Sequence, residues 1–417
     1  MCILTGMDNF NVGVIGGGAA GIMAALSVKK HHPEKSVILI DRTFELGRKL
    51  LIAGAGRGNL TNKNLQKDPT EYIHGPKALI QHIFQQLGYQ DIVTFFQDIG
   101  ITLYEEQKTG RGKMFPSIDH AKTVRDILVD ELTTNHVVVQ VNTEVQSMTY
   151  AGTAWNIQTT NGPVQVQDCI LSCGGKTYPS LGSNGSGYEL ARSIGHTIIE
   201  PIPSAVPLVS KNTLSHLLQG EKLGMQVTSE DGVSMIGDVL FTQYGLSGSA
   251  ILDMSRNISI ALHRHHQTQV VIKLSFFPGK TERDIRQVLE ERWKSHEDQL
   301  VARSLWGLVT TKVAGAVCAV SEIPKDKTVG NMTMEEKNRV IQTLSSYECR
   351  ITDTRGWNEA EFSTGGVVAD EVDDRTLASK KVSHLYIAGE LLDVDGDVGG
   401  FNLSWAWASG WVAGKLQ

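Results

Sequence analysis

The chain has 417 residues, of which 41% are hydrophobic and 20% are charged, and its formal net charge is −6. This is an ordinary globular composition, and the length allows a large core with a second, inserted domain. The negative charge and the lack of a long basic run argue against a nucleic-acid partner.

The cysteines and the apolar runs bear on the cellular compartment of the protein. Five cysteines are irregularly spaced and form no C-x-x-C pair, which predicts neither a disulfide framework nor a zinc site and favours the cytoplasm. No run of about 18 apolar residues occurs, so no membrane span is expected. The stretch Met1–Met7 is short and lacks a basic start, so it does not resemble a signal peptide.

A glycine-rich turn stands between two apolar runs near the start of the chain. Residues 11–15 and 37–41 predict strands, and residues 22–26 predict the helix between them. The intervening segment reads Gly16-Gly17-Gly18-Ala19-Ala20-Gly21, a G-x-G-x-x-G pattern in the strand–turn–helix context of a dinucleotide site. Gly16 permits the turn, Gly18 lets the backbone approach a pyrophosphate and Gly21 packs the helix on the strand.

The second predicted strand ends in an acid. Asp41 stands where a carboxylate can accept hydrogen bonds from ribose hydroxyls, and Arg42 follows it. The helix after the glycine turn offers free N–H groups and a positive dipole end to phosphates. This motif by itself does not separate FAD from NAD.

Three further segments favour FAD. The loop from Gly47 to Asn62 combines glycines such as Gly56 with Arg48, Lys49, Arg57 and Asn59, as a strap over an extended dinucleotide requires. Alternating runs at 144–150, 154–160 and 164–167 predict a small β-meander, with Val145 near an adenine. The next predicted strand, from Ile170, ends in Gly174-Gly175.

The third segment lies near the carboxyl end. A strand at 385–390 brings Gly389 and Glu390 to the edge where open α/β sheets bind ligands. A helix predicted from Ser404 to about Ala413 points its N-terminus back at that edge. The N–H groups of Asn402 and Leu403 are then candidate donors to a reduced flavin, whose negative charge a helix N-terminus stabilises.

With these blocks in order, the chain resembles the aminoacetone oxidase and BaiN-type (YhiN-type) family of NAD(P)/FAD-dependent oxidoreductases. The resemblance covers the whole chain, from Gly16–Gly21 to Ala388–Gly414, and the C-terminal block is the most specific. Two blocks depart from the family pattern: Gly58 stands where a cysteine is usual, and Ser172-Cys173 replaces Ala-Thr. Both changes keep small residues, so FAD binding should survive.

The expected fold is α/β, a Rossmann-type FAD-binding domain of the two-dinucleotide-binding-domain kind with an inserted cap. The FAD-binding domain is expected at residues 1–196 and 350–417, and the cap at 197–349, β-rich over 197–300 and helical over 300–349. Helices are predicted at 282–296, 300–311 and 334–344. The glycine-containing segment Phe241–Gly248 is either a substrate-facing edge or a structural corner.

Neither metal nor catalytic triad is predicted. His263, His265 and His266 lack carboxylate or cysteine partners, and Asp393, Asp395 and Asp397 lack the glycine and glutamate of a calcium loop. His196 follows Gly195 at a predicted helix end, where histidines often interact with the dipole.

A flavin carries out its own electron transfer, so the protein supplies position and electrostatics. Tyr178, Glu390 and Trp407 are candidates for catalytic pocket residues or, alternatively, for the core. Gly366 is expected to lie against the isoalloxazine ring. The residues expected to hold FAD non-covalently are Gly16, Gly18, Ala19, Ala20, Gly21, Asp41, Arg42, Arg48, Lys49, Gly56, Arg57, Asn59, Val145, Gly174, Gly366, Gly389, Glu390, Asn402 and Leu403.

These observations predict a FAD-dependent oxidoreductase of a small molecule. Two reactions remain open: oxidation of an amine or ketone by oxygen, and reduction of an enone-type substrate by NAD(P)H docking transiently. No second nucleotide motif follows a strand, since Gly182–Gly187 has the wrong spacing. The alternative is a flavin-holding protein with a non-redox or RNA-modification role. The sequence leaves the oligomeric state open.

Overall fold

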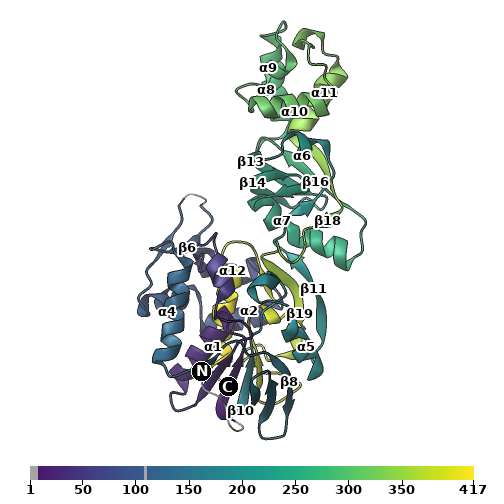
Figure 1. Ribbon diagram of the computed structural model, residues 1–417. Helices are drawn as coiled ribbons and strands as arrows, with labels where there is room; N and C mark the ends of the chain where they lie inside the picture. The colour runs from purple at the N-terminus through teal and green to yellow at the C-terminus, as the bar shows by residue number, and fades with distance from the viewer. Residues whose placement is uncertain (1–7, 108–109) are drawn as a thin grey trace. The chain divides into compact units, whose positions relative to one another are not determined.

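The computed structural model describes residues 8–107 and 110–417, so the expectation for Met1–Met7 lies outside the described residues. Contacts divide the chain into two compact units. Unit 1 comprises Met1–Pro201 and Glu361–Gln417, and unit 2 comprises Ile202–Ala360. Unit 1 therefore contains both the purple and the yellow ends of the chain in Figure 1.

Unit 1 is built on a seven-stranded sheet whose central strands are parallel. β1 (Asp8–Ile15) pairs in parallel with β2 (Val37–Ile40) on one side and with β10 (Gly162–Leu171) on the other. β7 (Val138–Gln140) continues the sheet beyond β2, and β20 (Leu385–Ile387) joins β10. Residues 12–15 of β1, the strands β2 and β20, and residues 169–171 of β10 are apolar and buried, as a parallel sheet covered on both faces requires, whereas Val138 and Val139 of the edge strand β7 are exposed. The fold class is therefore Rossmann-type α/β.

One long strand connects the parallel sheet to the meander. β8 (Val145–Tyr150) and β9 (Trp155–Thr159) pair antiparallel, and β9 pairs with the first half of β10. The second half of β10 pairs with β20. The prediction of two strands here, one ending at residue 167 and the next beginning at residue 170, is wrong, because β10 runs through all ten residues without a break.

Two helices from opposite ends of the chain pack against each other on this sheet (Figure 1). α1 is Ala19–His31 and α12 is Phe401–Ala413. A Cβ at Gly410 would lie 2.3 Å from the Ala20 carbonyl oxygen, so only glycine permits this approach. α12 begins at Phe401, earlier than predicted, because Gly400, with φ 104°, supplies the left-handed cap that starts the helix.

Shorter elements complete unit 1. Its further helices are α2 (Lys77–Gln86), α3 (Tyr89–Asp98), α4 (Ala121–Thr134) and α5 (Ser186–Ser193). Its further strands are β3 (Thr61–Asn62), β4 (Ile73–His74), β5 (Leu103–Glu105), β6 (Lys113–Pro116), β19 (Phe362–Val367) and β21 (Asp395–Gly396). β11 (Ile198–Ser204) pairs with β19 and crosses the boundary between the units.

Unit 2 holds a seven-stranded sheet in the order β17-β16-β13-β14-β15-β12-β18, with antiparallel pairing. The strands are β12 (Leu208–Val209), β13 (Lys222–Ser229), β14 (Ser234–Thr242), β15 (Gly245–Ser247), β16 (Val270–Ser275), β17 (Tyr347–Ile351) and β18 (Asp353–Thr354). Because β17 and β18 belong to this sheet, unit 2 extends past residue 349 to Ala360.

The helices of unit 2 differ in part from the predicted ones. They are α6 (Thr213–Leu217), α7 (Ser249–Ser259), α8 (Glu282–Lys294), α9 (Val301–Ser304), α10 (Thr311–Val320) and α11 (Met334–Ser346). The helix predicted over 300–311 is wrong: α9 is a single turn, Gly307 follows with φ 85°, and Thr310 caps the next helix by accepting from the Val313 N–H. α7 lies within the region expected to be β-rich.

Candidate functional site

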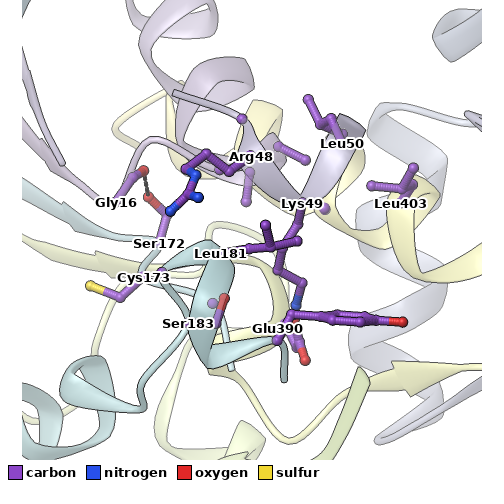
Figure 2. Close-up of a pocket in the computed structure, with 18 of the residues that line it drawn as sticks. Gly16, Arg48, Lys49, Leu50, Ser172, Cys173, Leu181, Ser183, Glu390 and Leu403 are labelled. Atoms are coloured by element: carbon purple, nitrogen blue, oxygen red, sulfur yellow. Dashed lines mark hydrogen bonds and ion pairs between the residues drawn. The ribbon is translucent and has the colours of Figure 1, made fainter. Parts of the chain in front are cut away.

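A cavity of about 380 Å³ lies in unit 1 at the carboxyl ends of β1, β2 and β10. Its wall also includes the start of α1, the loop after β2, and the first turns of α12. Figure 2 shows Lys49 reaching toward Glu390, and Arg48 beside Gly16 and Ser172. Segments from both ends of the sequence thus line one continuous space.

The glycine turn forms one end of this cavity. Gly16 has φ 103°, and a Cβ there would lie 2.6 Å from the Ser172 carbonyl oxygen. A Cβ at Gly21 would lie 1.8 Å from the Gly16 carbonyl oxygen, so this glycine seats α1 on the turn. Around Gly18, in contrast, no other part of the described chain comes within 4 Å of the position that a Cβ would take. The backbone at Gly18 is therefore open to whatever the cavity holds.

Asp41 directly follows β2 and is fixed by its neighbours. Its Oδ2 accepts from the Gly17 N–H at 2.6 Å, and its Oδ1 accepts from the Thr43 N–H at 2.7 Å and the Thr43 hydroxyl at 2.6 Å. A carboxylate has about four acceptor positions, so one remains for a ligand hydroxyl. The same carboxylate thus orders the glycine turn and faces the cavity.

A second charged group joins segments that are distant in the sequence. Lys49 Nζ lies 2.8 Å from Glu390 Oε2 and donates to the Thr177 hydroxyl, also at 2.8 Å. Glu390 Oε1 accepts from the Ser363 N–H and hydroxyl, at 2.9 and 2.8 Å. Burial by itself would raise the pKa of Glu390, but Lys49 and Ser363 outweigh it and lower that pKa. The carboxylate is therefore ionised near neutral pH.

The first turn of α12 forms the other wall. Asn402 and Leu403 occupy the second and third helical positions, whose N–H groups have no partner within a helix. The Asn402 side chain accepts from the Gly396 N–H at 2.8 Å and donates to the Gly396 carbonyl at 2.7 Å. The helix start is thereby held in place, with its N–H groups and its positive dipole end at the cavity.

These features fit a dinucleotide. Asn59 lines the cavity, and its Oδ1 is buried without a hydrogen-bond partner among the described residues, so it can accept from a molecule bound in the cavity. The open backbone at Gly18 and the first turn of α12 suit a diphosphate and a negatively charged ring. The donor set of this cavity therefore fits FAD.

Most of the residues predicted to hold FAD line the cavity. They are Gly16, Gly18, Ala19, Ala20, Asp41, Arg42, Arg48, Lys49, Asn59, Val145, Gly174, Glu390, Asn402 and Leu403, together with the pocket candidate Tyr178.

Six of the predicted residues do not line it: Gly21, Gly56, Arg57, Gly366, Gly389 and Trp407. Arg57 instead pairs with Glu106 at 2.8 Å and Asp119 at 3.1 Å. Trp407 is fully buried and donates to the Leu60 carbonyl at 2.9 Å, so it belongs to the core.

The glycines outside the cavity serve packing. A Cβ at Gly366 would lie 2.5 Å from the Leu391 carbonyl oxygen, and a Cβ at Gly389 would lie 2.7 Å from the Ala20 Cβ. These two glycines let backbone segments approach each other. Gly56 turns the strap with φ 84°.

Sequence reasoning missed several parts of the wall, among them Lys113, Glu361 and Phe362 and a segment that follows β10. Leu181, Gly182, Ser183 and Ser186 line the cavity, although this glycine-rich segment was set aside because its spacing does not fit a nicotinamide site. The segment follows shortly after the double glycine that comes after β10, and this position could have indicated that it lies at the cavity.

The described residues, 8–107 and 110–417, contain no group of three or more His, Cys, Asp or Glu side chains placed to hold a metal ion. Over the same residues, none of the helices is both long enough and apolar enough to cross a bilayer.

Comparison with known proteins gives consistent results. The family described as "HI0933-like protein Rossmann domain" matches residues 10–416. A 3-dehydro-bile acid delta(4,6)-reductase of Clostridium scindens is 31% identical over 97% of this chain and 98% of its own length. A ribosomal RNA dihydrouridine synthase of Escherichia coli is 28% identical over 98% of each chain.

Among solved structures, a 3-ketosteroid delta1-dehydrogenase from Sterolibacterium denitrificans matches with a TM-score of 0.53. It is 11% identical, over 98% of this chain and 99% of that one. At this identity the likeness concerns the fold alone.

Proposed function

Because this chain belongs to the HI0933-like Rossmann-domain family and is therefore a FAD-dependent oxidoreductase, we propose that it reduces a carbon–carbon double bond conjugated to a carbonyl group. The observation that carries the proposal is the full-length relative named as a 3-dehydro-bile acid delta(4,6)-reductase. That name describes a ketone whose neighbouring double bonds are saturated. The dihydrouridine synthases are named for the same chemistry, because the uracil double bond is also conjugated to a carbonyl.

The cavity residues have separate tasks in this proposal. When bound, FAD supplies the two-electron chemistry. The glycine turn at Gly16–Gly21 holds the diphosphate, and Asp41 accepts from a ribose hydroxyl. The N–H groups of Asn402 and Leu403, at the start of α12, would donate to the ring of bound FAD and would stabilise negative charge on it.

The proposed electron donor is a nicotinamide dinucleotide that docks transiently. The family resemblance supports this donor, and the single G-x-G-x-x-G turn, which serves FAD, means that the donor has no comparable site of its own. A small ketone is the proposed acceptor, and oxygen is the competing one.

A second candidate is reduction of uridine in ribosomal RNA, which the names of two relatives, 28% and 26% identical, favour. The net charge of −6 gives no general attraction to a phosphate backbone, so such binding would depend on local contacts.

The test uses the FAD-loaded protein without oxygen. NADPH or NADH should bleach the flavin, and a 3-oxo bile acid with double bonds at positions 4 and 6 should restore its colour and yield the saturated product. Restoration by unmodified ribosomal RNA alone, with dihydrouridine in the digest, would support the second candidate. A flavin that only oxygen reoxidises would overturn both.

A further inference from the structure

Tyr178 combines a position in the cavity wall with a strained backbone. Its φ of 53° and ψ of 63° lie in the left-handed region, which a bulky side chain rarely occupies. Pro179 follows, and a residue before proline favours extended conformations, which makes this conformation more costly still. Strain of this kind persists only where the surroundings impose it, and it is concentrated at functional sites.

The surroundings that impose it are the polar contacts around Lys49. The preceding Thr177 is fully buried, and its hydroxyl accepts from Lys49 Nζ at 2.8 Å. One residue earlier, the Lys176 N–H donates to the Ser363 hydroxyl at 3.3 Å. On the other side, the Tyr178 carbonyl accepts from the Leu181 N–H at 2.8 Å. The segment is therefore held on both sides of the strained residue.

The same contacts tie Tyr178 to the α12 end of the cavity. Lys49 pairs with Glu390, and the adjacent Gly389 N–H donates to the Ser409 hydroxyl of α12 at 2.9 Å. Trp405 of α12 donates through Nε1 to the Gly389 carbonyl at 3.1 Å. Trp405 follows Asn402 and Leu403 on α12 and lines the same cavity, so these hydrogen bonds link the segment of Tyr178 to the helix whose first turn is the proposed place of the reacting ring.

Three other proton carriers in the cavity wall suit an acid role less well. Glu390 is ionised near neutral pH and has no proton to donate. Loss of a proton from Lys49 would leave the Glu390 carboxylate partly buried and without its cation. The Cys173 thiol donates to the Ile15 carbonyl, and burial raises its pKa to about 12. A phenol keeps its proton at neutral pH and can donate it to a developing carbanion.

We propose that Tyr178 is the catalytic acid of the proposed reduction, an inference that rests on the proposed function. A hydride from the reduced cofactor forms the new C–H bond at the β-carbon, and the phenolic proton of Tyr178 forms the C–H bond at the α-carbon. The C=C π bond breaks and the O–H bond of Tyr178 breaks. The substrate gains two electrons and the cofactor loses two, which a nicotinamide dinucleotide replaces. Water then returns a proton to the phenolate.

The test separates the two half-reactions of Tyr178→Phe. The FAD-loaded variant is reduced with dithionite without oxygen and mixed with the 3-oxo bile acid that carries double bonds at positions 4 and 6. Flavin reoxidation should be slower than in the unchanged protein by about 10²- to 10⁴-fold, the usual contribution of a general acid. Reduction by NADPH should stay within about twofold, because no proton is donated to substrate in that step.

Equilibrium binding provides a readout apart from turnover. The dissociation constant of the saturated 3-oxo product for the oxidised protein, measured by calorimetry, should change by less than about threefold in Tyr178→Phe, because the ring remains in the wall. Tyr188→Phe is the matched control. Tyr188 is 4% exposed and does not line the cavity, so this variant should reoxidise at the unchanged rate.

Two results would overturn the role of Tyr178. The first is flavin reoxidation in Tyr178→Phe as fast as in the Tyr188→Phe control. The second is slow flavin reoxidation in Lys113→Met, a change at another cavity residue, with an unchanged rate in Tyr178→Phe. If the unchanged protein fails to reoxidise on this ketone, the proposed function falls and the inference with it. The behaviour of the unchanged protein therefore distinguishes the two failures.

Discussion

Lys49 Nζ and Glu390 Oε2 lie 2.8 Å apart although 341 residues separate them in the chain. Both side chains are largely buried, with exposed fractions of 28% and 21%. The pair joins the strap after β2 to the turn after β20, and it lies in the cavity wall. Its contribution to stability should therefore depend on pH.

The first prediction concerns Lys49→Met. The pKa of Glu390 is lowered in the folded protein, so its charge adds stability above its ordinary pKa of about 4, and that stability is lost as the pH falls through the lowered value. Without Lys49, burial dominates and raises this pKa. We expect the free energy of unfolding to fall by about 1–3 kcal/mol near neutral pH and by less in acid, as measured by urea unfolding of the cofactor-free protein.

Lys122→Met is the control for this measurement. Lys122 pairs with Asp126 at the surface, with exposed fractions of 61% and 46%, and its loss should change the free energy of unfolding by less than about 1 kcal/mol. Equal effects of the two substitutions, at every pH, would show that the Lys49–Glu390 pair is no more than a surface contact.

The second prediction compares two glycines of one turn. Gly21→Ala places a Cβ 1.8 Å from the Gly16 carbonyl oxygen, so it should lower the stability of the cofactor-free protein by more than about 2 kcal/mol. Gly18→Ala meets no protein atom within 4 Å, so it should leave that stability unchanged and weaken FAD binding at least about tenfold. Thermal unfolding and FAD fluorescence titration give the two quantities. If Gly18→Ala binds FAD as tightly as the unchanged protein, the diphosphate does not lie against Gly18.

The third prediction concerns the buried acceptor of Asn59. Asn59→Ala removes an oxygen that has no partner within residues 8–107 and 110–417, so the cofactor-free protein should be as stable as before, while FAD affinity falls by about 1 kcal/mol, roughly fivefold. Asn62 is the contrast. Its side chain donates to the Gly399 carbonyl and accepts from the Asn64 N–H, so Asn62→Ala should destabilise the cofactor-free protein. The idea fails if Asn59→Ala lowers the unfolding temperature as much as Asn62→Ala does.

The fourth prediction concerns acid stability. Burial alone would raise the pKa of Glu371, but hydrogen bonds from Lys381, Thr197 and His196 lower it to about 2. The ionised form therefore stabilises the fold above about pH 4.5, and this stability disappears as the pH falls toward 2. Glu371→Gln should flatten the loss of stability over this range, and Glu189→Gln, at a residue whose side chain is 72% exposed, should not. Acid titration followed by circular dichroism measures both.

The sequence predicted the parts of the fold that are local. The β1–turn–α1–β2 unit follows from one contiguous pattern, and the fold class is confirmed by the structure and the family match. Gly21 was expected to pack α1, and the geometry agrees with that role.

The sequence does not predict which distant segment a given side chain contacts. Arg57 lies in the predicted strap, but the acids that it pairs with, Glu106 and Asp119, belong to a later hairpin and turn. Trp407 lies on α12, which is apolar on nearly every side, so periodicity does not tell which face meets the cavity. His196 was expected to interact with a helix end, whereas it is buried between Glu371 and Ser379.

The pairing of β20 with β10 and the packing of α12 on α1 have a consequence during synthesis. A nascent chain that stops before residue 401 possesses the glycine turn and the strap but lacks an entire wall of the cavity. Unit 2 is continuous in sequence, so it can fold before the C-terminal part of unit 1 has been synthesised. Tight capture of the cofactor must therefore come late, after the ribosome has passed the region that encodes α12.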